Sequence, residues 1–249
     1  MAAGGARKAL ATAAEARKAL GEGLDKLFDY MVALAELSEL AIRKAAASLE
    51  TLDAEMADDV FTIDNEVYAL QVEIESTCGD LLALHAPVAR DLRLITTSLK
   101  ITTDLDRIGR YAKDIAEIAL QLRGTGFGAF ARLPGLPQMV ELTVNMVDTA
   151  TEAFVRRDAQ SVKDMQVVDD AVDRLHEETF TALVAYMENG TLTIDVGTRY
   201  LLVSRYLERI ADHAVNIGER VVYMVTGERI PRVRAADRAK KEVPGGKGP

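Results

Sequence analysis

Apolar residues recur along this chain in alternating steps of three and four, a spacing that keeps them on one face of an α-helix. Four such stripes each predict a helix, and two further helices are expected over residues 24–52 and 139–157. No stretch alternates apolar and polar residues as a strand would. The pattern predicts an all-α protein. The four clearest stripes are Val60, Ile63, Val67, Leu70, Ile74, Cys78 and Leu81; Ile101, Leu105, Ile108, Ala112, Ile115, Ala119 and Leu122; Met165, Val168, Val172, Leu175 and Thr179; and Val203, Leu207, Ile210, Ala214, Ile217, Val221 and Met224.

Glycine and proline divide the chain near its middle. Residues 124–137 hold four glycines and two prolines, which are typical of a linker, and the long stretches on either side contain almost no proline. We therefore expect a three-helix unit over residues 24–123 and a second over 138–228. An Ala-rich segment at residues 1–23 is expected to be a helical extension.

The two halves resemble each other in sequence. Leu105-Asp106-Arg107-Ile108 recurs as Leu207-Glu208-Arg209-Ile210, and Ile63-Asp64 recurs as Val168-Asp169 at nearly the same offset. Two matches at similar offsets indicate an internal duplication. The expected architecture is two antiparallel three-helix bundles, because short connections place successive helices antiparallel.

Composition narrows the classes of partner. The 249 residues carry a formal net charge of -9, which argues against nucleic acid as a partner. Residues 229–249 hold seven bases and two acids and end in glycine and proline, so we expect a mobile basic tail. A single cysteine and the lack of a long apolar segment favour a cytoplasmic protein without a membrane span.

Acidic side chains flank two of the apolar stripes at a spacing of four residues, which places each pair on one helix face. If the two helices are neighbours, the four carboxylates converge, and hard cations would relieve their mutual repulsion. The alternative is a solvated acidic face, since pairs at this spacing also arise by chance in a chain with 39 acids. The candidate metal ligands are Asp169, Asp173, Glu208 and Asp212.

Three segments give the chain a likeness to a known family. Residues 87–95, Pro-Val-Ala-Arg-Asp-Leu-Arg-Leu-Ile, resemble a helix-joining motif of the PhoU family, the regulators of phosphate uptake. Residues 105–109 and 207–214 resemble that family's paired Leu-Glu-Arg-Ile-Gly-Asp repeats. The resemblance implies two three-helix bundles, homodimer formation and multinuclear metal clusters held by acidic pairs. It also implies a regulatory role that couples a phosphate transporter to a sensor histidine kinase.

The two halves differ in how well they keep the family's acidic pairs. The second half retains both, Asp169 with Asp173 and Glu208 with Asp212. In the first half, Tyr68 follows Asp64 and Arg110 follows Asp106 where second acids would fall. We expect Arg110 to pair with Asp106 or Asp64 and to supply positive charge in place of metal, because a guanidinium can engage a carboxylate through two hydrogen bonds.

The leading interpretation is a cytoplasmic, non-enzymatic regulator of phosphate uptake or signalling. No nucleophile–base arrangement, Walker loop or histidine-based zinc motif indicates catalysis. The resemblance implies that its partners are the ATPase subunit of a phosphate transporter, a sensor kinase, or both, with membrane contact through them. The metal cluster, in the second bundle, would hold iron, zinc, magnesium or manganese, which ligand type alone does not distinguish. The alternatives are a helical adaptor without metal and a carboxylate-bridged di-metal enzyme.

Overall fold

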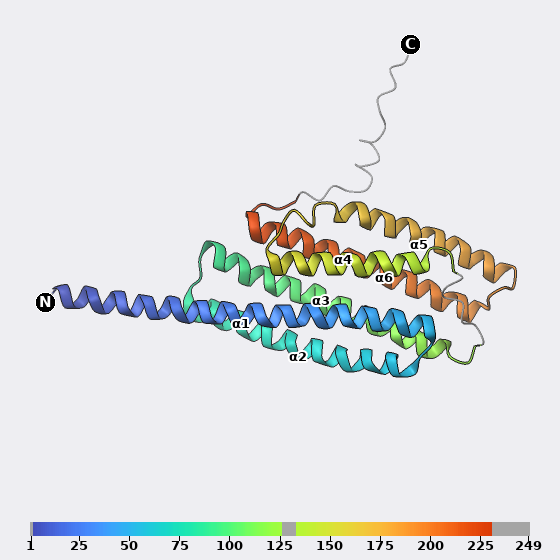
Figure 1. Cartoon of the computed structure of the whole chain (residues 1–249), viewed down its shortest axis with the longest axis horizontal. Helices are drawn as coiled ribbons and strands as arrows, with labels where there is room; N and C mark the ends of the chain where they lie inside the picture. The colour runs from blue at the N-terminus through green and yellow to red at the C-terminus, as the bar shows by residue number, and fades with distance from the viewer. Residues whose placement is uncertain (1, 126–132, 231–249) are drawn as a thin grey trace, which may run out of the picture.

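The computed structural model describes residues 2–125 and 133–230, and within these ranges it contains six α-helices and no strand. The prediction of an all-α protein is confirmed. The centre of the predicted linker and nearly all of the predicted mobile basic tail lie outside the described residues. The helices are α1 (Ala2–Thr51), α2 (Ala54–His85), α3 (Ala89–Leu122), α4 (Leu136–Arg156), α5 (Met165–Glu188) and α6 (Ile194–Thr226) (Figure 1).

The helices form two antiparallel three-helix bundles that lie side by side (Figure 1). Helices α1, α2 and α3 pack against one another, as do α4, α5 and α6. The bundles meet where α3 packs along α6 and α1 touches α4. Helix α1 continues without a break through the Ala-rich segment, so that its first turns project beyond the bundle. None of the helices within the described ranges combines the length and apolar character that crossing a membrane requires.

The predicted stripes form the core of each bundle. Every member of the stripes on α3 and α6 is buried, and the members on α2 and α5 are buried or packed against buried neighbours. Burying a Leu, Ile or Val side chain contributes about 1.5–3 kcal/mol, so these faces hold the helices together. Cys78 is fully buried, and this burial raises the pKa of its thiol to about 12, so it remains a protonated core residue.

Helix ends are fixed by local chemistry. The Asp53 carboxylate accepts a hydrogen bond from the backbone N–H of Glu55 at 2.8 Å, which caps the start of α2. Gly135 precedes α4 with φ of 81°, and a Cβ at this position would lie 2.8 Å from the Thr179 hydroxyl. That hydroxyl donates a hydrogen bond to the Pro134 carbonyl at 3.0 Å. The end of the linker is therefore fastened to α5 at a position that only glycine fits.

A buried polar cluster joins the two bundles. Asp104 on α3 is 4% exposed, forms an ion pair with Arg220 and contacts the His213 imidazole, both on α6. The His213 Nδ1 lies 2.9 Å from an Asp104 carboxylate oxygen. Burial lowers the pKa of His213 and so favours the neutral imidazole, and Arg220 supplies the positive charge that compensates Asp104. Removing a member of such a buried network leaves an uncompensated polar group, so the cluster fixes how α3 and α6 sit together.

Candidate metal centre

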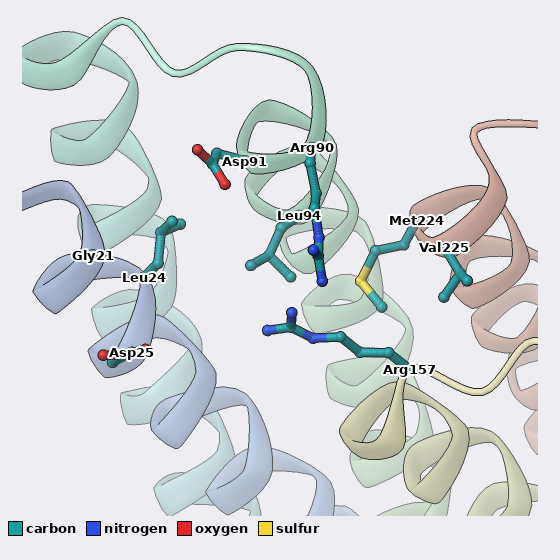
Figure 2. Close-up of a pocket in the computed structure, with 9 residues that line it drawn as sticks. All are labelled: Gly21, Leu24, Asp25, Arg90, Asp91, Leu94, Arg157, Met224 and Val225. Atoms are coloured by element: carbon teal, nitrogen blue, oxygen red, sulfur yellow. The ribbon is translucent and has the colours of Figure 1, made fainter. Parts of the chain in front are cut away.

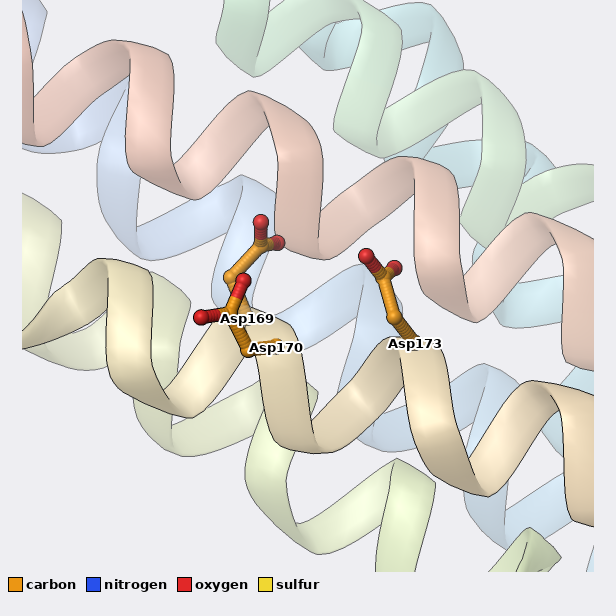
Figure 3. Close-up of side chains that lie close together, drawn as sticks. All are labelled: Asp169, Asp170 and Asp173. Atoms are coloured by element: carbon orange, nitrogen blue, oxygen red, sulfur yellow. The ribbon is translucent and has the colours of Figure 1, made fainter. Parts of the chain in front are cut away.

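Helix α5 carries three carboxylates on one part of its surface. Asp169, Asp170 and Asp173 each offer an oxygen, and these oxygens lie within 4.8 Å of one another. Asp169 is 7% exposed because it follows the partly buried Val168 on the side of α5 that meets α6. Figure 3 shows the Asp169 and Asp173 side chains rising from α5 toward α6. The structure brings together two of the four predicted ligands and adds Asp170 to them.

The electrostatics of this group disfavour three free negative charges. The pKa of Asp169 rises from 3.8 to about 7, first because the carboxyl group is buried and then because of the charges of Asp173 and Asp212. Gln166 partly opposes this rise by donating a hydrogen bond to the carboxylate at 2.8 Å. A carboxyl group that is half protonated near pH 7 is one that a cation would convert to the charged form.

Helix α6 contributes the other two predicted ligands from the facing side. Burial, followed by the charges of Glu208 and Asp212, raises the pKa of Asp173, so carboxylates of the two helices act on each other. Both α6 residues are partly exposed and each forms an ion pair on its own helix, Glu208 with Arg205 and Asp212 with Arg209. They lie outside the group of three close oxygens. Their carboxylates thus lie between the arginines of α6 and the acids of α5.

The donor set fits hard cations. Carboxylate oxygens are the ligands that magnesium, manganese and iron accept in helical bundles, and no thiol lies in the group. His176, the nearest histidine on α5, has its Nδ1 3.0 Å from the Ser204 hydroxyl on α6. The sequence pattern did not identify Asp170, because it does not lie directly beside the apolar stripe of α5 as Asp169 and Asp173 do. Its adjacency to Asp169 was the available signal.

The corresponding place in the first bundle is neutralised by the protein itself. The Arg110 Nε donates to both Asp106 oxygens at 3.1 and 3.2 Å, which confirms the pairing expected from the sequence. The Lys113 Nζ lies 2.7 Å from an Asp64 oxygen, a pairing that the sequence interpretation missed. Tyr68 is 58% exposed and adds no charge. Asp64 and Asp106, the acids that remain at the positions of the family's pairs, therefore each have a basic partner on α3.

These features define a class of protein: two copies of a three-helix unit, joined side by side, with acidic residues spaced along the faces of matching helices. A family model described as PhoU domain matches the chain twice, over residues 31–119 and 136–221, with one match in each bundle. The chain belongs to the PhoU family, and the resemblance noted in the sequence is confirmed.

Relatives and solved structures agree with this assignment. A protein of Zymomonas mobilis named as a phosphate-specific transport system accessory protein PhoU homolog is 32% identical over 221 residues, covering 88% of this chain and 92% of the relative. A homolog of the same name from Deinococcus radiodurans is 32% identical over 86% of this chain and 99% of its own length. The crystal structure of PhoU from Pseudomonas aeruginosa superposes with a TM-score of 0.79 at 32% identity, covering 84% of this chain and 99% of that one. The crystal structure of PhoU from Streptococcus pneumoniae superposes with a TM-score of 0.77 at 30% identity, covering 86% of this chain and 100% of that one. The two-bundle fold is confirmed.

Proposed function

We propose that this protein is a cytoplasmic regulator of phosphate uptake and phosphate signalling that works by metal-dependent contact with other proteins. The observation that carries the proposal is the match of both bundles to the PhoU domain, with relatives named as accessory proteins of the phosphate-specific transport system. An accessory role fits a helical body without a catalytic constellation in its described part. Its partners are the ATPase subunit of a phosphate transporter and a sensor histidine kinase, and it acts as a homodimer.

The proposed metal centre consists of Asp169, Asp170 and Asp173 on α5, with Glu208 and Asp212 on α6. The three close oxygens and the raised pKa of Asp169 support it, because a bound cation removes both the repulsion and the need for a proton. When bound, the cation neutralises the centre and changes the charge that the second bundle presents to a partner. The arginines that pair with Glu208 and Asp212 hold those carboxylates in place while no cation is bound.

The experiment combines metal content with transporter regulation. Purified Asp169→Asn and Asp173→Asn variants should hold less metal than the unaltered protein when measured by inductively coupled plasma mass spectrometry. The matched control is Glu178→Gln, which removes the same charge from an exposed position on α5. In cells that lack the native protein, the two centre variants should fail to restore control of phosphate uptake, whereas the control variant should restore it.

Direct binding then tests the partner. Purified transporter ATPase should bind the metal-loaded protein more tightly than the chelator-treated protein, and the difference should vanish in Asp169→Asn.

Different outcomes favour the other candidate functions. Less than one ion per chain, with regulation and partner binding intact in the centre variants, would favour a helical adaptor that uses no metal. Redox or hydrolytic turnover that is lost with Asp173→Asn would favour a carboxylate-bridged di-metal enzyme. Among the described residues, no histidine joins the group of Asp169, Asp170 and Asp173. Di-iron sites of helical bundles normally include histidine ligands.

A further inference from the structure

A cavity lies at one end of the molecule, where the two bundles meet. It has a volume of about 540 Å³ and is enclosed by α1 and the start of α3 on one side and by the ends of α4 and α6 on the other (Figure 2). This volume is within the range of pockets that bind small molecules. Its lining residues are Gly21, Leu24, Asp25, Arg90, Asp91, Leu94, Arg157, Met224 and Val225.

Two arginines from different bundles face each other in this cavity. Arg90 belongs to the first turn of α3, and Arg157 closes α4 in the left-handed conformation, with φ of 54°. Figure 2 shows their guanidinium groups turned toward one another across the gap between α3 and α4. Within residues 2–125 and 133–230, neither forms an ion pair, and the recorded contact of Arg157 is with the face of the Phe28 ring at 5.7 Å.

A third guanidinium adds to the positive charge nearby. Arg93 follows Arg90 by three residues, so both lie on the same side of α3. Its Nε is buried and has no hydrogen-bond partner among the described residues. Like charges that face each other repel, and an orphaned buried donor is unfavourable. This end of the molecule is therefore arranged for an anion, in a protein whose net charge is -9.

We propose that this cavity binds a phosphate group, either as inorganic phosphate or as part of a small phosphate ester, between Arg90 and Arg157. A tetrahedral oxyanion presents oxygens on opposite sides, so each guanidinium can engage it with two hydrogen bonds. The proposal does not depend on the metal centre, and it holds or fails separately from the regulatory function proposed above.

The remaining lining residues refine the choice of anion. Asp25 and Asp91 lie on the α1 side of the cavity, away from the gap between the guanidinium groups (Figure 2). Their placement leaves the gap between Arg90 and Arg157 to the anion. Leu24, Leu94 and Met224 form an apolar wall large enough for the organic part of an ester.

The position of the cavity gives such binding a structural effect. Arg90 belongs to the first bundle and Arg157 to the second, so a phosphate group held by both links the bundles at this end. Ligands that bind only the folded state also raise its stability. Phosphate should therefore increase the thermal stability of the protein as well as bind to it.

Calorimetric titration of the full chain with inorganic phosphate tests the site, after chelator treatment so that a bound metal cannot hold the anion. We expect saturable binding of one phosphate per chain. Arg90→Gln and Arg157→Gln should each weaken it by about tenfold or more, as expected for loss of a charge-assisted contact. Arg90→Lys keeps the charge but loses the planar fork, so its affinity should fall between those of Arg90→Gln and the unaltered protein.

The matched control is Arg156→Gln. Arg156 is the residue beside Arg157, it is exposed and paired with Glu152, and it does not line the cavity. We expect its phosphate affinity to stay within about twofold of the unaltered protein, since a surface charge of this kind contributes little. Circular dichroism establishes that each variant is folded, and phosphate should raise the melting temperature of the control but not of the double variant Arg90→Gln, Arg157→Gln.

Adenosine monophosphate distinguishes the two sources of the phosphate group. Tighter binding than inorganic phosphate supports an ester, and equal or weaker binding supports free phosphate. The proposal is overturned if neither ligand binds saturably, if the double variant binds phosphate as well as the unaltered protein, or if Arg156→Gln is as damaging as Arg157→Gln.

Discussion

Replacing Asp169 by Asn should stabilise the metal-free protein at neutral to alkaline pH. The substitution keeps the size of the side chain and leaves an oxygen to accept the hydrogen bond from Gln166. It removes a negative charge from a buried position beside Asp173. The variant therefore separates the unfavourable charge from the packing around it.

The size of the effect follows from the pKa of Asp169. Its rise from 3.8 to about 7 corresponds to about 4 kcal/mol, because each pH unit is about 1.4 kcal/mol. Since the neighbouring Asp173 is exposed and water screens part of the repulsion, we expect about 2–4 kcal/mol of added stability. For a chain of this size, that raises the melting temperature by roughly 5–15 °C.

The difference in stability between the unaltered protein and the asparagine variant depends on pH. The folded protein binds the Asp169 proton more tightly than the unfolded chain, so the unaltered protein loses stability as pH rises from about 4 to 7. The asparagine variant has no such loss. The difference between the two should be small at pH 4 to 5, grow up to pH 7, and remain constant above it.

Thermal unfolding followed by circular dichroism, in chelator and across this pH range, measures the difference. Glu178→Gln is the control, and its stability should stay within about 0.5 kcal/mol of the unaltered protein because the residue is exposed. Added divalent metal should stabilise the unaltered protein and leave Asp169→Asn unchanged. An asparagine variant that is less stable at pH 8, or a difference that does not vary with pH, would refute the reasoning.

Three further substitutions test other parts of the structure. Arg110→Asp should raise the metal content per chain, because it removes the counter-charge of Asp106 and adds a carboxylate; unchanged content would count against replacement of metal by arginine. Asp104→Ala should lower the free energy of unfolding in urea by about 3 kcal/mol, since it leaves His213 and Arg220 without their shared partner, and a loss below about 1 kcal/mol would contradict this. Gly135→Ala should destabilise by about 1–3 kcal/mol in the same assay, because φ is 81° and the Thr179 hydroxyl occupies the space, whereas an unchanged midpoint would show that the turn relaxes freely.

Local periodicity was sufficient to predict the helices. Residues such as Val203, Leu207 and Ile210 face the core because the helix turns once every 3.6 residues, and this is a property of nearby sequence alone. The pairing of Arg110 with Asp106 could be predicted for the same reason, since both lie one turn apart on α3.

Contacts between helices could not be predicted in this way. Lys113 reaches Asp64 across 49 positions of sequence, and the pairing depends on how α2 and α3 are rotated against each other. The cavity between Arg90 and Arg157 depends on how the start of α3 and the ends of α4 and α6 meet beside α1, which no local pattern specifies. Glu208 and Asp212 were recognised by spacing, but their pairing with arginines on their own helix depends on side-chain conformations that spacing does not encode.

The basic partners of Asp64 and Asp106 are built into the polypeptide, so these two carboxylates are balanced without a bound cation. Asp169 and Asp173 on α5 form no ion pair among the described residues, and the pKa of Asp169 lies at about 7, so the charge at this place changes with pH and with bound cations. One chain thus combines a bundle whose acids are paired internally with a second bundle whose charge depends on pH and on bound cations. This difference allows the second bundle to change its charge while the first bundle keeps its arrangement.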